Sequence, residues 1–211
     1  MKPLLAASIL SVEPASLAAE IASVEGLVDW LQVDVMDGKF VENRAFPIEE
    51  IREIHTSLPL DFHLMVADPE GQIPAFLELK PKHISFHAEA VSASEDRLKL
   101  IEIIHTGGAT AGIAINPQTQ ISEIQDVISA VDLVLVMSVQ PGKGGQKFLP
   151  EVLSKVKELR AAHPSLMIQM DGGINAQTAK ACIEAGANNL VLGSYLFKST
   201  DKTQAIAQLF A

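Results

Sequence analysis

The chain has 211 residues, 48% of them hydrophobic and 20% charged, which is enough for one sizeable core and short for two. We therefore expect a single domain over residues 1–211. The formal net charge is −10, with no run of Lys or Arg, which argues against nucleic acid or an anionic membrane surface as the partner. An anionic small ligand would need a local site of positive potential.

The cysteine content and the N-terminus indicate a cellular compartment. Cys182 is the one cysteine of the sequence; it cannot form an internal disulfide, fits a reducing cytoplasm and reads as core filler. The apolar run 4–10 follows a single Lys, as in a signal peptide, but it reads equally well as a first strand, which the rest of the chain needs. No apolar stretch approaches the roughly 20 residues of a membrane span. We expect a cytoplasmic protein.

Short apolar runs alternate with stretches of helical period from end to end. The expected strands are 4–10, 29–36, 60–66, 83–87, 110–115, 133–139, 166–171 and 190–193. The helical patterns between them include Leu17, Ile21 and Val24; Ile48, Ile51 and His55; Leu98, Ile101 and Ile104; Ile121, Ile124, Val127 and Ile128; and Val152, Val156 and Leu159. Strand and helix units in this number predict an α/β fold, the closed (β/α)8 TIM barrel. An open doubly wound sheet usually has fewer strands and a GxGxxG turn, which is missing after the first strand.

Alternation along each expected strand separates an apolar face from a polar one. The polar sets are Gln32, Asp34 and Met36; Asp61, His63 and Met65; His83, Ser85 and His87; and Gln169 with Asp171. We expect them to point into the barrel, near the strand C-termini where barrel enzymes keep their chemistry. For any one of these residues a satisfied polar layer is the better interpretation. Convergence from several strands favours a functional site.

Three Gly-containing turns follow the last three expected strands: 140–146, 171–175 and 193–194. Backbone N–H groups exposed in such turns bind phosphate without a net positive charge. One such turn also serves ordinary chain reversal, but barrels commonly bind phosphate in this quarter. The turns therefore indicate how an acidic protein holds an anion.

The motifs now described resemble the ribulose-phosphate 3-epimerase family closely, along nearly the whole chain. They are Ser8-Ile9-Leu10-Ser11, Val33-Asp34-Val35-Met36-Asp37-Gly38, His63-Leu64-Met65-Val66, Leu135-Val136-Met137-Ser138, Gly144-Gly145-Gln146-Lys147-Phe148, Asp171-Gly172-Gly173-Ile174 and Gly193-Ser194. The resemblance implies a barrel of the ribulose-phosphate-binding type that inverts C3 of a ketose phosphate, interconverting ribulose 5-phosphate and xylulose 5-phosphate or close analogues in the pentose phosphate pathway. It implies Asp34 and Asp171 as general base and general acid.

The same resemblance assigns the other site residues. A divalent ion (Zn, Mn, Fe, Co or Mg) is implied at Asp34, His63 and Asp171, with Gln32 at the position of a family histidine. The methionines Met36, Met65 and Met137 correspond to a cap over the ene-diolate. The implied substrate-binding residues are Ser8, His63, Gly142, Lys143, Gly144, Gly145, Gly172, Gly173, Gly193 and Ser194. The expected partner is a small phosphorylated sugar, and we expect a homo-oligomer.

The chemistry explains why two carboxylates are needed. Inverting a carbon beside a carbonyl requires removal of its proton from one face and return of a proton to the other, through an ene-diolate. A single base would restore the original centre. A metal at the oxygens would stabilise the developing negative charge.

The sequence departs from the family pattern at informative positions. Gln32 replaces a histidine, and a neutral amide oxygen is a weaker ligand than imidazole for zinc-like ions. Lys143 replaces a residue that is usually Phe, while Lys39 and Glu42 replace a His and a Pro. These changes fall at the expected entrance of the site, so the substrate need not be ribulose 5-phosphate.

Two other functions stay open at this point. A non-catalytic or altered-specificity sugar-phosphate-binding relative is suggested by the missing histidine, although both aspartates are kept. A related barrel decarboxylase or aldol-type synthase would resemble a D-x-K-x-x-D segment. The chain has no lysine at that spacing after Asp34, where Met36 stands instead.

Overall fold

The computed structural model describes residues 2–211, and within them eight parallel strands form a closed barrel. They are β1 (Leu4–Ser8), β2 (Trp30–Asp37), β4 (Leu60–Met65), β5 (His83–His87), β6 (Thr110–Ile115), β7 (Leu133–Met137), β8 (Met167–Asp171) and β9 (Asn189–Leu192). Strand β1 pairs with β9 on one side and with β2 on the other, which closes the ring. The predicted (β/α)8 TIM barrel is confirmed.

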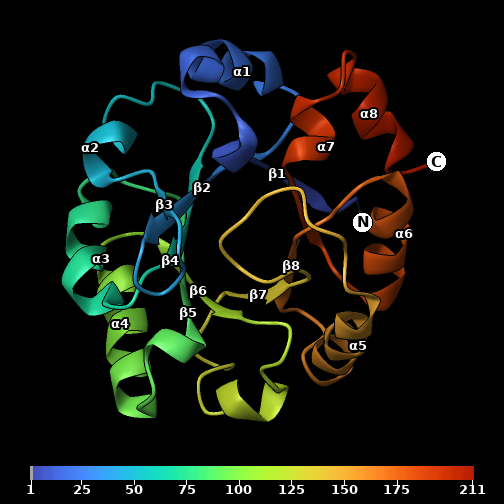
Figure 1. The fold of residues 1–211 in the computed structure, drawn as a ribbon. Coiled ribbons are helices and arrows are strands. Elements are labelled where there is room, and N and C mark those ends of the chain that lie inside the picture. The colour runs from blue at the N-terminus through green and yellow to red at the C-terminus, as the bar shows by residue number, and fades with distance from the viewer. Residues whose placement is uncertain (1) are drawn as a thin grey trace.

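Helices surround this barrel, as Figure 1 shows. They are α1 (Leu17–Val24), α2 (Ile48–Ile51), α3 (Pro69–Leu77), α4 (Ser94–Thr106), α5 (Leu153–Ala162), α6 (Ala176–Ala185), α7 (Ser194–Phe197) and α8 (Lys202–Gln208). Short 3₁₀ turns cover Ile9–Ser11, Pro14–Ser16, Ala88–Ala90, Ile121–Ile124 and Pro150–Val152. Across residues 2–211, every helix is too short or too polar to cross a membrane.

Two expected helices are shorter than their apolar patterns suggested. The pattern from Ile121 to Ile128 forms a 3₁₀ turn followed by hydrogen-bonded turns, and α2 ends at Ile51, before His55. Buried apolar side chains at these positions still cover the barrel, as Ile124 and Ile51 show. Periodic burial therefore did not require a complete α-helix, because tertiary packing outweighs local propensity.

The buried face of α4 also differs from the expected one. Leu98 is 41% exposed, whereas Arg97 is 8% exposed. The guanidinium of Arg97 donates to the carbonyls of Ala88, Val91 and Glu123. A buried Arg is tolerated because its donors are satisfied and its stem is apolar.

An additional strand, β3 (Arg44–Ala45), pairs antiparallel with the end of β2 and was not predicted. Two residues are too short for alternation to show in a sequence.

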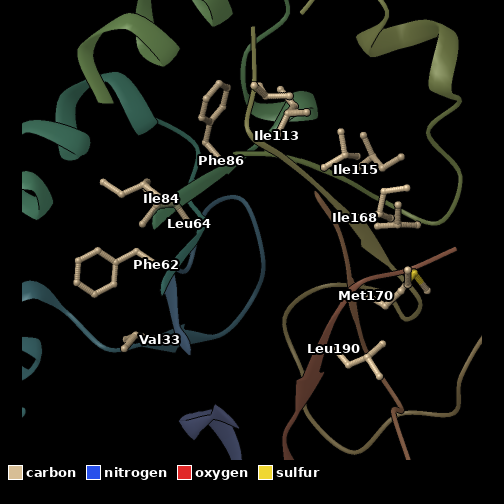
Figure 2. Packing of buried hydrophobic residues seen from close by; sticks show 14 of the residues in the cluster. Val33, Phe62, Leu64, Ile84, Phe86, Ile113, Ile115, Ile168, Met170 and Leu190 are labelled. Carbon is tan, nitrogen blue, oxygen red and sulfur yellow. The ribbon is translucent and has the colours of Figure 1, made fainter. Parts of the chain in front are cut away.

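The core consists of two apolar clusters, one outside and one inside the barrel. Figure 2 shows Phe62, Ile84 and Phe86 projecting outward from their strands, toward the helices. Inside, Trp30, Leu133 and Leu135 belong to a smaller cluster. The rest of the interior carries fully buried polar side chains, among them Gln32, Asp61, His63, His83, Ser85 and Gln169. Alternation therefore directed the polar faces inward, as predicted.

Candidate active site

Four polar side chains from β2, β4 and β8 meet inside the barrel. Gln32 Nε2 donates to Asp34 Oδ1 over 3.0 Å and to Asp171 Oδ2 over 2.9 Å. His63 Nδ1 lies 2.9 Å from Asp34 Oδ1 and 3.6 Å from Asp171 Oδ2. Strand register places Asp34 beside His63. One amide nitrogen and one ring nitrogen thus lie between two carboxylates.

Asp34 is held from both sides. Ser8 Oγ donates to its Oδ2 over 2.6 Å, while Gln32 and His63 contact its Oδ1. The side chain is 2% exposed, so its orientation is set by these bonds. Ser8 ends β1, the strand beside β2, and its predicted place at the site agrees with this contact.

Burial and charge act in opposite directions in this cluster. Burial alone would lower the pKa of His63, but the carboxylates of Asp171 and Asp34 raise it to about 9. Burial and the nearby Asp34 raise the pKa of Asp171, against the hydrogen bonds from His63 and Gln32. The two carboxylates thus favour positive charge at the point where His63 Nδ1 faces them.

Asp34, His63 and Asp171 also form a donor set for a metal ion. One ligand atom from each lies within 4.8 Å of the other two. Two carboxylate oxygens and an imidazole nitrogen suit divalent ions from Mg²⁺ to Zn²⁺. Gln32 Oε1 is buried and has no hydrogen-bond partner within residues 2–211. The residues present therefore fit a cation, and the orphaned amide oxygen is an additional candidate ligand.

A second layer of polar residues lies behind His63. His63 Nε2 is 2.9 Å from His87 Nε2, and His87 Nδ1 is 3.1 Å from Glu89 Oε2. The other oxygen of Glu89 accepts from Asn116 N, over 2.8 Å, and from the Thr119 hydroxyl. The sequence placed His87 on an inward face but gave it no role, and Glu89 was missed because it follows the strand, where alternation gives no signal.

Burial and hydrogen bonding have opposite effects on the two ionisable side chains of this second layer, His87 and Glu89. Burial lowers the pKa of His87 to about 4. Burial would raise the pKa of Glu89, but the hydrogen bonds from His87, Thr119 and Asn116 lower it to about 2. Glu89 is therefore a carboxylate beside a neutral imidazole.

A cavity opens above the cluster, between the strand ends and the loops after β7, β8 and β9. Most of the predicted site residues line it: Ser8, Asp34, Met65, Met137, Gly142, Lys143, Gly144, Gly145, Asp171, Gly172, Gly173, Gly193 and Ser194. Gln32 and His63 are fully buried behind it. Met36 and Lys39 line a different cavity, beside Arg44 and Phe46. Register nevertheless pairs Met36 with Met65, so these two methionines are neighbours, and the cavity above the cluster is lined by Lys143 but not by Lys39.

The glycines after β8 allow two loops to touch. Gly173 has φ of 65°, and a Cβ added to it would lie 2.7 Å from Phe148 N in the loop after β7. At Gly172 the added atom would lie 2.5 Å from Val139 Cγ2. At Gly145 it would meet none of the described atoms within 4 Å. Gly173 is therefore required for packing of the two loops, in addition to its expected place among the substrate-binding residues.

Two side chains outside the predictions fix the same loops. Ser138 Oγ lies 2.9 Å from the carbonyl of Asp171 and 2.7 Å from that of Gly172, which connects the ends of β7 and β8. Asn175 Oδ1 accepts from the backbone N–H groups of Gln177 and Thr178 at the start of α6. Because Asn175 occupies these N–H groups, a phosphate would bind N–H groups of the loops rather than those of the first turn of α6.

Comparison with known proteins shows that the chain belongs to the ribulose-phosphate 3-epimerase family. Residues 4–197 match the model of the ribulose-phosphate 3 epimerase family. The chain is 42% identical to the ribulose-phosphate 3-epimerase of Bacillus subtilis, covering 97% of this chain and 96% of the relative. It is 41% identical to that of Mycobacterium tuberculosis, with 98% and 91% covered. The chloroplastic ribulose-5-phosphate-3-epimerase of Arabidopsis thaliana is 40% identical, with 94% and 73% covered.

Solved structures of low sequence identity share the fold. KGPDC from Streptococcus mutans has a TM-score of 0.72 at 12% identity, with 100% of this chain and 96% of that chain covered. The 3-keto-L-gulonate-6-phosphate decarboxylase of Vibrio cholerae has a TM-score of 0.73 at 16% identity, with 100% and 96% covered. At such identities the likeness concerns the barrel.

Proposed function

Because the chain belongs to the ribulose-phosphate 3-epimerase family, we propose that it inverts the C3 centre of a ketose phosphate, ribulose 5-phosphate or a close analogue. The observation that carries the proposal is the pair Asp34 and Asp171. Both line one cavity, and both contact the same amide nitrogen of Gln32. Epimerisation beside a carbonyl requires two such proton carriers within reach of one carbon.

The two aspartates have the environments of a base and an acid. Asp34 accepts hydrogen bonds from Ser8 and Gln32, as a carboxylate that removes a proton does. Burial and the nearby Asp34 raise the pKa of Asp171, and its carboxyl group would return a proton to the opposite face of the ene-diolate. A reverse turnover exchanges these two roles.

The metal site is part of the proposal. Asp34, His63 and Asp171 would hold the ion. Gln32 would contribute Oε1 after a flip of its amide group, which exchanges the positions of its oxygen and nitrogen. A bound divalent ion would supply positive charge next to the carbonyl and hydroxyl oxygens of the substrate. The amide oxygen is a weak ligand, so we propose occupied but weak binding by an oxygen-tolerant ion such as Mn²⁺ or Mg²⁺.

The phosphate is assigned to the loop side of the cavity. The glycine turns 142–145, 172–173 and 193–194 line this side of the cavity, and peptide N–H groups in such turns can bind phosphate without net charge. Among the described residues that line this cavity, Lys143 has the one cationic side chain. Met65 and Met137 would cover the intermediate, since soft sulfur side chains exclude water there. A homo-oligomer and a cytoplasmic location are still predictions of the sequence.

The test is proton exchange at C3. Incubated in deuterated water with a panel of ketose phosphates, the enzyme should convert ribulose 5-phosphate to xylulose 5-phosphate with deuterium at C3. A different member of the panel reacting fastest would keep the mechanism and change the substrate, as Lys39, Glu42 and Lys143 allow. Binding of sugar phosphates without exchange would contradict the proposal and indicate a non-catalytic relative.

A further inference from the structure

The polar residues behind His63 form a continuous line of hydrogen bonds that ends at Glu89. The two ring nitrogens His63 Nε2 and His87 Nε2 are 2.9 Å apart, and His87 Nδ1 lies 3.1 Å from Glu89 Oε2. Both imidazoles are fully buried. Water is therefore no alternative partner, and each contact in the line needs one proton on one of its two atoms.

The fixed end of the line decides where these protons lie. A carboxylate only accepts hydrogen bonds, so His87 Nδ1 must be the donor to Glu89. With its proton on Nδ1, His87 has a lone pair on Nε2, and the proton shared by the two rings belongs to His63 Nε2. The remaining nitrogen of His63, Nδ1, is the atom that faces Asp34 and Asp171.

We propose that Glu89 is a positioning residue, which acts through His87 to fix His63 with its proton on Nε2 and so reserves Nδ1 for the ion between Asp34 and Asp171. A ring nitrogen binds a metal only through a lone pair, and the hydrogen bond made by the other nitrogen determines which one is free. The inference rests on the metal role given under Proposed function and extends it to a residue outside the cavity.

The surroundings of Glu89 make one substitution unusually informative. Glu89 Oε1 accepts from the backbone N–H of Asn116, over 2.8 Å, and a peptide N–H can only donate. In Glu89→Gln the amide oxygen should therefore stay at Asn116, and the NH₂ group should face His87 Nδ1. That nitrogen would have to accept, so the proton of His87 would move to Nε2. His87 would donate to His63 Nε2, and His63 would carry its proton on Nδ1. Replacing the carboxylate by an amide of almost the same shape would thus reverse the direction of every hydrogen bond between residue 89 and His63.

The experiment reads the ring protons directly. Hydrogen–nitrogen correlation spectra of metal-free, nitrogen-labelled protein should show His87 protonated on Nδ1 in the parent and on Nε2 in Glu89→Gln. Titration with Mn²⁺ alone and with Zn²⁺ alone, in the absence of any sugar, should show affinity about 10- to 100-fold lower in the variant, the usual cost of losing such a supporting contact.

A matched control is available at the outside of the barrel. His105 Nε2 contacts Asp132 Oδ2 over 2.7 Å, and the His105 side chain is 41% exposed. Asp132→Asn makes the same chemical change at a His–carboxylate pair away from the cluster. It should leave the spectrum of His87 and both metal affinities as in the parent.

Every result of these experiments either supports or overturns the proposed role of Glu89. Protonation of parent His87 on Nε2 overturns the proposal, as does a variant with an unchanged His87 spectrum and unchanged metal affinity. If Glu89→Gln fails to fold, the spectrum of the parent alone is decisive, since it contains the predicted Nδ1 proton or does not. If the parent binds neither ion, the metal part of the proposed function fails, and the ring spectra still decide the proton order.

Discussion

Two buried carboxylates in the same barrel have opposite surroundings. Asp34 accepts from Ser8 and Gln32 and contacts His63, and it lines the cavity. Asp61 lies in the next strand of the barrel, on its inward face, and pairs in register with Gln32, two residues before Asp34. Its Oδ2 accepts from Gln169 over 2.8 Å, but its Oδ1 has no partner within residues 2–211.

The difference shows that the hydrogen-bond donors around a carboxyl group and its distance from solvent determine its chemical role. Burial raises the pKa of Asp61 to about 7, so a large fraction of this carboxyl group is protonated near neutral pH. Its role is to complete the buried polar layer of the barrel. The pair Asp34 and Asp171 has donors between its members and an opening to solvent. The same residue type, on neighbouring strands, thus serves as part of a buried polar layer in one place and as a reactive site in the other.

The largest expected effect separates these two regions. Asp34→Asn and Asp171→Asn should each lower turnover by about 10³-fold, because each removes one proton carrier from a two-face mechanism. Asp61→Asn resembles the protonated side chain already present and should change turnover by no more than a few-fold. Steady-state kinetics on variants with native circular dichroism check this. Near-normal turnover in either Asp34→Asn or Asp171→Asn would contradict the assignment.

Metal removal should have the next largest effect. Exhaustive EDTA treatment should abolish most activity, and a divalent ion should restore it. Gln32→His should bind the ion about tenfold more tightly or better, because imidazole replaces a weak amide ligand. Elemental analysis of protein purified without chelator, together with activity after EDTA, checks this. Full activity without metal would contradict it and leave Lys143, rather than Lys39, as the cation near the ene-diolate.

A comparison of two glycines tests the loops above the cluster. Gly173→Ala should destabilise the contact between the loops and raise KM for sugar phosphates, because its Cβ would meet the backbone of Phe148. Gly145→Ala should cost about 1–2 kcal/mol, from its positive φ of 73° alone. Thermal unfolding and KM for both variants measure the difference. Equal effects on stability and KM would show that the close approach at Gly173 is unimportant.

The dependence of stability on pH tests Asp61, the carboxyl group that lies deeper in the barrel than Asp34 and Asp171. A carboxyl whose folded pKa is raised contributes stability that is complete below its unfolded pKa, near 4, and is lost as the pH rises through about 7. Asp61→Asn cannot ionise, so at pH 8.5 it should exceed the parent in stability by about 2 kcal/mol, and by less at pH 5. Urea unfolding at both pH values, with EDTA present, gives the comparison. Identical pH dependence in the two proteins would show that Asp61 does not titrate near 7.

The sequence by itself determined the fold and most of the site. The strands β5 and β6 have the predicted bounds, because alternation and β-branched composition are local properties of the chain. The inward position of Asp34, His63 and Asp171 follows from the same alternation. The glycine turns mark the loops that follow the last strands.

Tertiary structure decided what these residues touch. The bond from Gln32 to Asp171 joins positions 139 residues apart, and Met36 lies beside Met65 because β2 and β4 pair in that register. The burial of Arg97 required three carbonyls from other segments, and the line from His63 to Glu89 required two neighbouring strands in one register. Local periodicity fixes the face on which a side chain lies, while distances across a barrel depend on how the ring closes.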